Sequence, residues 1–199
     1  RRMKIAHMVG DTLFVHAGVT PAALTRFLHE TFQDGAPSSD QYLDAINARA
    51  TWAIQEGKYT DWILTMDHID GRQNHDSPVW TNLFEVNPEF HSKSGLEICD
   101  MVKDVLQTLG ASRMVKGHDP QKTGEAAVRC EGKLILADTF MSIGYTERAL
   151  GRIQDYRVRH RAARRVSEHN LMAWETSTNG TDARIVYPLR NKWCQDVDP

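Results

Sequence analysis

Two short apolar segments, far apart in the chain, each end in a histidine beside a turn-forming residue. The first covers residues 13–15 and is followed by His16, and the second covers residues 113–116 and leads to Gly117 and His118. Short apolar runs of this kind are typical of buried strands. Side chains that follow buried strands lie at the sheet edge where ligands bind, so we expect the two imidazoles to meet there. The pattern therefore predicts a functional site at that edge.

Two further segments stand in a fixed order around these histidines. Ser77-Pro78-Val79-Trp80-Thr81 lies between them, and a strand-like run over residues 134–138 with the loop 139–142 comes after them. This ordered set resembles the C-terminal half of the calcineurin-like metallophosphoesterase family, in which a His-Ala-Gly and a Gly-His segment each supply one imidazole to a two-metal centre. The most similar branch is that of the Shewanella-like serine/threonine protein phosphatases, and the bacterial diadenosine tetraphosphatases come second.

The resemblance implies an α/β fold of the calcineurin-like metallophosphoesterase type, with a β-sandwich core flanked by helices. It implies that His16 and His118 are ligands of one metal and that a complete site holds two divalent ions, Mn, Fe or Zn. Such a pair of ions acidifies a bridging water and clamps the phosphate. A metal-bound imidazole also needs its second ring nitrogen fixed by a neighbour, for which Asp119 and Asp138 are candidates. No catalytic or substrate-binding residue of this chain is assigned.

The family's N-terminal motifs do not occur in the chain. Asp-x-His, Gly-Asp-x-x-Asp-Arg-Gly and Gly-Asn-His-Glu are absent, and Asn82 stands where related phosphatases place a phosphate-binding arginine. The resemblance therefore covers the C-terminal portion of a metallophosphoesterase domain, apparently without its N-terminal half. Whether the chain is an enzyme depends on a longer chain that would supply the missing motifs.

Three functions remain open at this point. The first is metal-dependent phosphoester hydrolysis of the serine/threonine protein phosphatase type, on a phosphorylated protein or a small phosphoester. The second is hydrolysis of a dinucleoside polyphosphate such as diadenosine tetraphosphate. The third is a non-catalytic remnant or binding module that keeps the fold, because the N-terminal motifs are absent.

The charge balance and hydropathy of the chain give no support for two classes of interaction, nucleic-acid binding and membrane insertion. The 199 residues carry a formal net charge of −2, which gives no electrostatic case for nucleic acid as a partner. No apolar run approaches the roughly 20 residues that a membrane-spanning helix needs. No secretory signal follows the basic start of the chain, so an intracellular location is favoured.

The three cysteines match no zinc or redox motif. Cys99, Cys130 and Cys194 are irregularly spaced and odd in number, which argues against a full disulfide framework. Cys99 also falls on the apolar side of an expected helix. We therefore interpret all three as reduced, structural thiols.

The local patterns predict one domain over residues 1–199. Helices are expected after Thr20 with Pro21 at the first position, over residues 40–56, and over residues 95–109 with a capping box at its start. Glu131-Gly132 predicts a hairpin turn. Residues 66–77 form a polar loop, the basic segment 147–169 is expected to be a solvated surface insertion, and 170–188 a C-terminal hairpin with Asn179-Gly180 at its turn.

Overall fold

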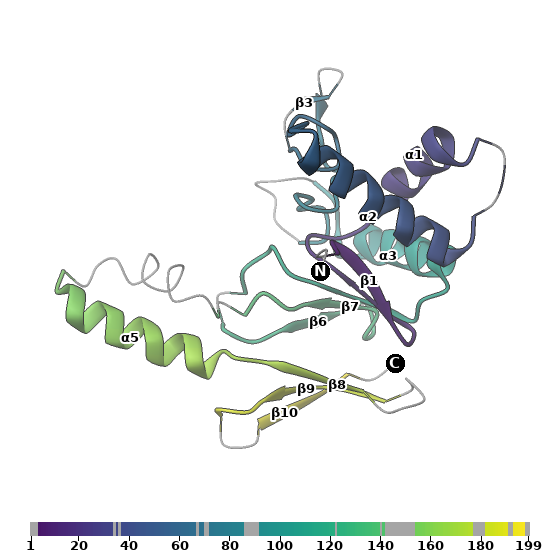
Figure 1. Cartoon of the computed structure of the whole chain (residues 1–199). Helices are drawn as coiled ribbons and strands as arrows, with labels where there is room; N and C mark the ends of the chain where they lie inside the picture. The colour runs from purple at the N-terminus through teal and green to yellow at the C-terminus, as the bar shows by residue number, and fades with distance from the viewer. Residues whose placement is uncertain are drawn as a thin grey trace.

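A mixed sheet of five strands forms the centre of the molecule in the computed structural model (Figure 1). The structure describes residues 4–33, 35, 37–66, 68–69, 72–85, 92–121, 123–139, 141, 154–176, 182–190 and 193–197. The strands follow the order β1-β2-β5-β7-β6, with bounds Ala6–Val9, Thr12–Val15, Arg113–Lys116, Leu134–Leu136 and Ala127–Arg129 respectively.

The three central strands run parallel. Val15 of β2 is in register with Lys116 of β5, and Lys116 is in register with Leu136 of β7. Their carboxyl ends therefore lie at one edge of the sheet, and their amino ends lie at the other. The outer strands β1 and β6 pair antiparallel with β2 and β7.

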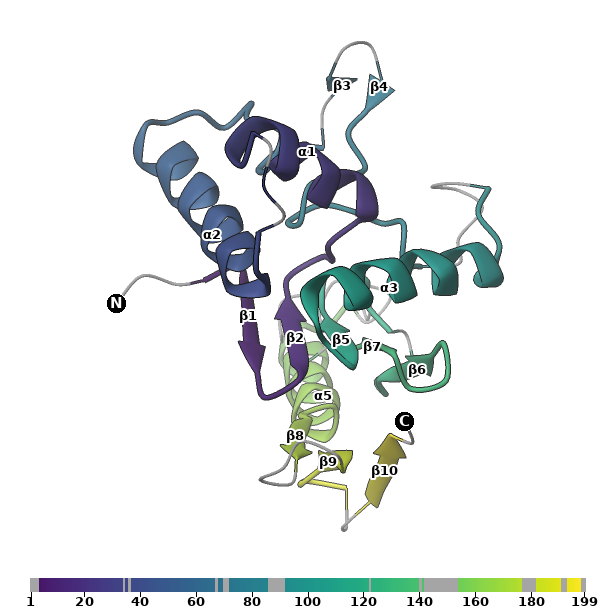
Figure 2. The ribbon, with the colours of Figure 1, turned by 90° about the vertical axis from the view of Figure 1, so that its right-hand side faces the viewer.

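Three helices cover one face of this sheet: α1 (Pro21–Thr31), α2 (Ser39–Gln55) and α3 (Gly95–Leu109). Figure 2 shows them on the same side. Each begins at a hydroxyl cap, as expected for α1 and α3: the side chains of Thr20, Ser38 and Ser94 accept hydrogen bonds from backbone N–H groups of the first turn. The apolar stripe of α3 packs into the core that the helices share with alternate strand residues, including Leu13, Met114 and Leu134.

A smaller antiparallel sheet lies against part of the other face. Its strands are β8 (Ala173–Thr176), β9 (Ala183–Tyr187) and β10 (Trp193–Val197), in the order β10-β9-β8. Phe14, Val115 and Ile135 of the large sheet pack with Ile185 and Tyr187 of the small one. β8 and β9 pair in the segment where the sequence places a hairpin, although the Asn179-Gly180 turn lies outside the described residues.

This arrangement corrects the expected fold class. The architecture is α/β and is organised around one mixed sheet with its helices on one face, and a calcineurin-like fold with a β-sandwich core is not shown. The physical reason is that strand order arises from contacts distant in sequence, such as the β2–β5 pairing, which local motifs do not encode.

Two peripheral elements extend from this core. The short hairpin of β3 (His68–Ile69) and β4 (Arg72–Gln73) lies within the polar loop expected over residues 66–77. Helix α5 (Tyr156–His169) projects away from both sheets in Figure 1. Arg157, Arg164 and Arg165 are exposed on it, as the basic pattern predicts for a solvated segment, whereas residues 147–153 lie outside the described part of the chain. No described helix is both long and apolar enough to cross a membrane.

A disulfide joins α3 to the turn between β6 and β7. Cys99 and Cys130 are bonded, with Cα atoms 5.2 Å apart. The prediction of three reduced thiols is therefore wrong for these two cysteines, and the side chain of Cys194 lies outside the described residues. The hairpin itself forms where Glu131-Gly132 predicts it: both residues have positive φ, and the Lys133 amide donates to the Cys130 carbonyl at 3.1 Å.

Candidate functional site at the carboxyl edge of the sheet

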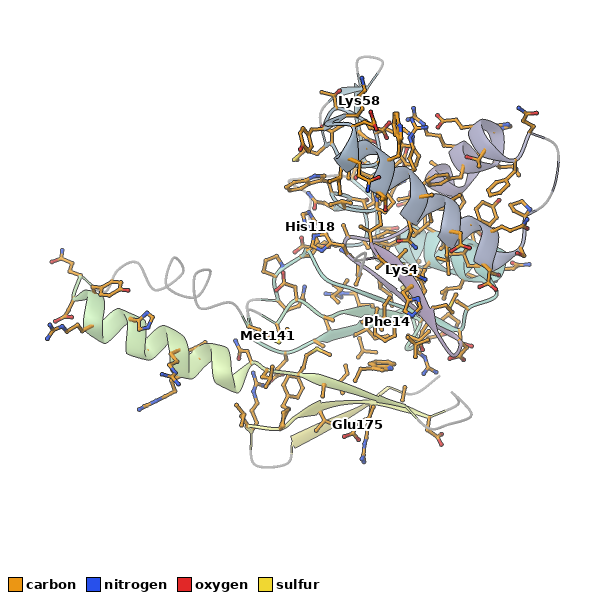
Figure 3. The ribbon with its side chains drawn as sticks, in the orientation of Figure 1. Lys4, Phe14, Lys58, His118, Met141 and Glu175 are labelled. Atoms are coloured by element: carbon orange, nitrogen blue, oxygen red, sulfur yellow. A yellow bond between two sulfur atoms is a disulfide. The ribbon has the colours of Figure 1, made fainter. Side chains whose placement is uncertain are left out.

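The two histidines that the sequence singles out lie side by side. His16 follows β2 and His118 follows β5, and their ring centroids are 5.4 Å apart. Figure 3 shows His118 at the edge of the sheet, on the side where the helices lie. His16 is exposed and His118 is partly buried, so both rings can meet a ligand from solvent. The expectation that two strands bring these imidazoles to one place is fulfilled, while their role as metal ligands stays a prediction.

The loop after β2 is fixed by backbone contacts to distant segments. The His16 amide donates to the Ile5 carbonyl at 3.2 Å, and the Ala17 amide donates to the Pro78 carbonyl at 2.8 Å. Gly18 has φ of +131°, and a Cβ atom there would lie 2.4 Å from the Phe84 ring. Only glycine satisfies both the backbone angle and this close approach.

His118 is held in an unusual backbone conformation. Its φ is +69°, in the left-handed region that residues with a side chain rarely adopt. The preceding Gly117 amide donates to the His16 carbonyl at 2.9 Å, which ties the two histidine loops together. Strain of this kind persists where the surrounding structure holds it, and it is common at functional sites.

Trp80 forms one wall beside His118. The ring centroids are 5.3 Å apart with the planes nearly perpendicular, and the Trp80 Nε1–H donates to the Leu64 carbonyl at 2.8 Å. Ser77 holds the same segment against the core, because its buried hydroxyl donates a hydrogen bond to the Ile63 carbonyl. The indole remains 41% exposed, so this tryptophan presents an aromatic surface at the site rather than only filling the core.

A buried ion pair lies behind the imidazoles. Lys116 Nζ bonds to the Asp119 carboxylate, and both side chains are almost fully buried. Burial lowers the pKa of Lys116 below its usual value, and the Asp119 carboxylate opposes that shift. Asp119 was a candidate to orient an imidazole, but its carboxylate is bonded to lysine instead. Asp138 follows β7 at the same edge.

The pKa values of both imidazoles are lowered. For His16, burial is the largest cause and the positive charge of Lys116 adds to it, while Asp138 and Asp119 oppose the shift. For His118, burial again comes first, Asp119 opposes it, and Lys116 and His16 lower the pKa further. Both rings are therefore mainly neutral near pH 7, and each offers one lone pair and one N–H donor.

A hollow of about 570 Å³ opens beside His16. Its walls are mostly apolar, and they include Phe14, Val79 and Ala137, with Lys4 and His7 at the N-terminal side. Cavities of this size and lining accept small ligands. The imidazole of His16 thus lies between the ring of His118 and a space that fits an apolar group.

Sequence reasoning missed Lys116 and Phe84. Lys116 ends the strand-like run 113–116, and its Nζ places a positive charge behind both imidazoles, 5.9 Å from the Phe84 ring centroid. A lysine inside an apolar run is the available signal, because an amine enters a buried strand only with an anionic partner. Of the other histidines, His7 borders the hollow beside His16, whereas His29 lies on α1, away from the pair.

The donor set does not fit a two-metal centre. In the part of the chain that the structure describes, no three His, Cys, Asp or Glu side chains are grouped to hold a metal ion. The Asp119 carboxylate beside the two imidazoles is bonded to Lys116. Two imidazoles without an anionic ligand bind a metal ion only weakly. The expectation of two divalent ions as cofactors, manganese included, is contradicted, and no step below passes through a metal.

Comparison with known proteins yields a likeness of fold. No family model and no curated protein matches the chain. One solved structure, titled a cold-active protein-tyrosine phosphatase of a psychrophile, Shewanella sp., matches with a TM-score of 0.55 and 14% sequence identity. The match covers 98% of this chain and 43% of that one, so the chain spans less than half of its length.

These findings overturn the family assignment made from the motifs. The similar structure carries the name of a protein-tyrosine phosphatase, and neither the family models nor the curated proteins support a calcineurin-like metallophosphoesterase or its Shewanella-like serine/threonine branch. Four short segments in the right order were too few to fix a family. What stands is a fold similar to that of a phosphatase, with two imidazoles and a tryptophan at the carboxyl edge of its parallel strands.

Proposed function

We propose that the chain hydrolyses phosphate esters, with the imidazoles of His16 and His118 exchanging the protons of the reaction. The observation that carries this proposal is the pair of imidazoles, one exposed and one partly buried, whose ring centroids lie 5.4 Å apart beside an apolar hollow. The fold's likeness to a structure titled a protein-tyrosine phosphatase supports it. A phosphorylated phenol is the favoured substrate class, because its ring fits the hollow beside His16 or the exposed face of Trp80.

The reaction needs one neutral and one protonated imidazole. The neutral ring accepts a proton from water as the water oxygen bonds to phosphorus, and the charged ring donates its proton to the leaving oxygen as the phosphorus–oxygen bond breaks. The products are an alcohol or phenol and inorganic phosphate, and the pair keeps the same total number of protons. General acid–base transfer of this kind contributes roughly 10² to 10⁴ in rate.

The test is hydrolysis of para-nitrophenyl phosphate by wild type, His16→Ala, His118→Ala and the control His29→Ala. His29 is an exposed histidine of α1, away from the pair. We expect kcat/KM to fall by about 10² or more in each site variant and to stay within about twofold in the control. Because the pKa values of both imidazoles are lowered, the pH profile of kcat/KM should be bell-shaped with its maximum below neutrality.

The alternatives are outcomes of the same experiment. Faster turnover of diadenosine tetraphosphate than of phosphotyrosine or phosphoserine peptides, lost in both site variants, would favour a dinucleoside polyphosphate hydrolase. No turnover of any of these substrates, with phosphate binding that requires both histidines, would identify a non-catalytic binding module. Equal activity in wild type and both site variants would refute the proposal.

A further inference from the structure

Helix α5 carries a charge opposite to that of the rest of the chain. Its 14 residues include five arginines and one glutamate, which gives a formal charge of +4. Because the whole chain carries −2, the other residues together carry −6. A charge asymmetry of this size within one chain indicates a binding surface for an anionic partner.

Most of these arginines stand on one side of the helix. Spacings of three and four residues place the backbone positions of four of them on a common face, the arginine face: Arg157, Arg161, Arg164 and Arg165. Three of them, Arg157, Arg164 and Arg165, are exposed. The helix contains no lysine, and a planar guanidinium group binds a carboxylate through two parallel hydrogen bonds. The arginine face therefore suits a partner that presents several carboxylates.

The helix stands clear of both sheets. Figures 1 and 2 show it extending away from the core, and no other helix or strand of the described residues packs along its length. Most helices in proteins are stabilised by packing against a neighbour, and a helix of this length is only marginally stable alone. A partner bound along α5 would supply contacts that the helix does not obtain from another described helix or strand.

A buried residue fixes the C-terminal end of α5 to the core. Asn170 follows the helix and is 6% exposed. Its carbonyl accepts a hydrogen bond from the Thr139 hydroxyl at 2.7 Å, and its Oδ1 accepts one from Arg190 at 2.7 Å. A Cβ atom at Gly124 would lie 2.3 Å from the same Oδ1, so a larger residue there would displace the amide. The helix thus extends from a tightly packed base.

This base lies at the edge of the sheet that carries the two imidazoles. Thr139, which holds Asn170, comes shortly after the carboxyl end of β7. The neighbouring Asp138 carbonyl accepts a hydrogen bond at 2.7 Å from the amide of Gln121, in the loop that begins with His118. A molecule bound to α5 would therefore be held at the carboxyl edge, where the proposed hydrolysis takes place.

Two other anionic partners fit α5 less well. The aliphatic residues of the helix are only alanine and valine, whereas helices that bind membrane surfaces carry tryptophan, phenylalanine or leucine. A long polyanion such as DNA would extend beyond α5 toward the rest of the chain, whose formal charge of −6 repels it. A short acidic peptide segment contacts the arginine face alone and avoids this repulsion.

We propose that α5 is a docking arm for an acidic segment of a phosphorylated protein. Aspartate and glutamate side chains of that segment pair with the arginine face, and the rest of the partner lies toward the carboxyl edge. Tethering of this kind raises the effective concentration of a phosphorylated residue at the imidazole pair. Binding of the acidic segment does not depend on hydrolysis, whereas its use as a substrate arm rests on the proposed function.

The binding test uses fluorescence anisotropy at low ionic strength, where exposed charges are least screened. The probe is a labelled peptide with a run of glutamates, and its neutral counterpart carries glutamines instead. Arg157→Glu with Arg164→Glu reverses two charges of the arginine face. Lys58→Glu with Lys103→Glu is the matched control, because it changes the net charge equally at two exposed lysines away from α5 (Figure 3). Far-UV circular dichroism verifies folding.

The arginine reversal should weaken binding of the glutamate peptide at least about tenfold, and the lysine reversal should weaken it less than about twofold. Arg157→Lys with Arg164→Lys keeps both charges but removes the paired donors, and should weaken binding about threefold. Equal losses in the two reversed variants would overturn the arm. So would binding of a short DNA duplex, or of phosphatidylserine vesicles, that is tighter than peptide binding and lost in the arginine reversal.

A second measurement tests the link to hydrolysis. For a phosphopeptide with a glutamate run, the arginine reversal should raise KM about fivefold without changing kcat, while hydrolysis of para-nitrophenyl phosphate stays within about twofold. Loss of peptide binding in a protein that hydrolyses no phosphate ester would support the arm and refute the hydrolytic proposal. Hydrolysis that requires His16 and His118, with equal KM for the glutamate and glutamine phosphopeptides, would overturn the substrate arm alone.

Discussion

The two edges of the large sheet are built in different ways. At the carboxyl edge, backbone hydrogen bonds between the loops of His16, Pro78 and Gly117 hold two titratable rings close together. At the amino edge, a disulfide between Cys99 and Cys130 joins α3 to the turn before β7, beside a cavity of about 600 Å³. The same three parallel strands thus support one edge fixed by backbone hydrogen bonds between distant segments and another that carries a covalent cross-link.

The difference indicates where each edge is vulnerable. Loss of a single buried charge or glycine disturbs the carboxyl edge, because its loops have little freedom to adjust. The amino edge contains a bond that reduction would break, because the disulfide joins α3 to a hairpin turn. The predictions below change residues at one edge at a time and compare the sizes of the resulting effects.

Breaking the buried ion pair should have the largest effect. Asp119→Asn leaves Lys116 buried without its counter-charge, and we expect the free energy of unfolding in urea to fall by about 3–5 kcal/mol. The double variant Lys116→Met with Asp119→Leu should recover most of this loss, because it removes both charges. A loss below about 1 kcal/mol in the single variant would contradict the assigned burial of the pair.

Removing the disulfide should cause the second largest loss of stability. It closes a segment with a sequence separation of 31 residues, and Cys99→Ser with Cys130→Ser should lower the free energy of unfolding by about 3–4 kcal/mol. Hydrolysis of para-nitrophenyl phosphate by the folded fraction should stay within about twofold of wild type, because the bond lies at the other edge. A selective collapse of kcat would show that the edges are coupled.

The two glycines that flank β2 offer a matched comparison. Gly18→Ala places a Cβ atom 2.4 Å from the Phe84 ring at φ of +131°, and we expect a loss of about 2–3 kcal/mol in chemical denaturation. Gly10→Ala, at φ of +59° with no atom within 4 Å of the added carbon, should cost about 1 kcal/mol. Equal losses would show that the packing against Phe84 is not tight.

The smallest effect concerns the pH dependence of stability. The pKa values of His16 and His118 are lowered by burial, so the unfolded chain binds more protons than the folded one as the pH falls through the ordinary histidine range. The stability that this difference in proton binding provides is fully present above the ordinary histidine range. It decreases as the pH falls toward the lowered pKa values of the folded protein. The double alanine variant should flatten the melting temperature between pH 7 and pH 5, whereas His29→Ala should keep the wild-type slope.

Local chemistry in the sequence was enough to locate several elements. Thr20 with Pro21, and Ser94 with Glu97, mark helix starts through contacts within one turn, and Glu131-Gly132 marks a hairpin for the same reason. The approach of His16 to His118 also followed from the rule that side chains after buried strands lie at the edge of a sheet where ligands bind. In each case the prediction rests on contacts between residues close in sequence or on a property that sheets share in general.

The misses depend on contacts between distant segments. The Cys99–Cys130 bond needs α3 and a hairpin turn to lie together, which no spacing rule encodes, and the partner of Asp119 depends on Lys116 facing the interior. The family assignment failed because short segments fix neighbours in sequence but leave the topology open. The environment of Arg113 could not be predicted for a related reason: its packing against the Trp174 ring and the lack of a hydrogen-bond partner for Nη1 among the described residues both depend on the packed interior.

The separation of His16 from His118 along the chain also bears on folding kinetics. The segment between β2 and β5 contains all three core helices, so the pairing of these two strands closes a loop that spans that whole segment. Contacts between residues so distant in sequence are slow to form, because a large loop must close before they gain any stabilisation. We therefore expect the contact between the two rings to form late in refolding, together with the pairing of β2 and β5.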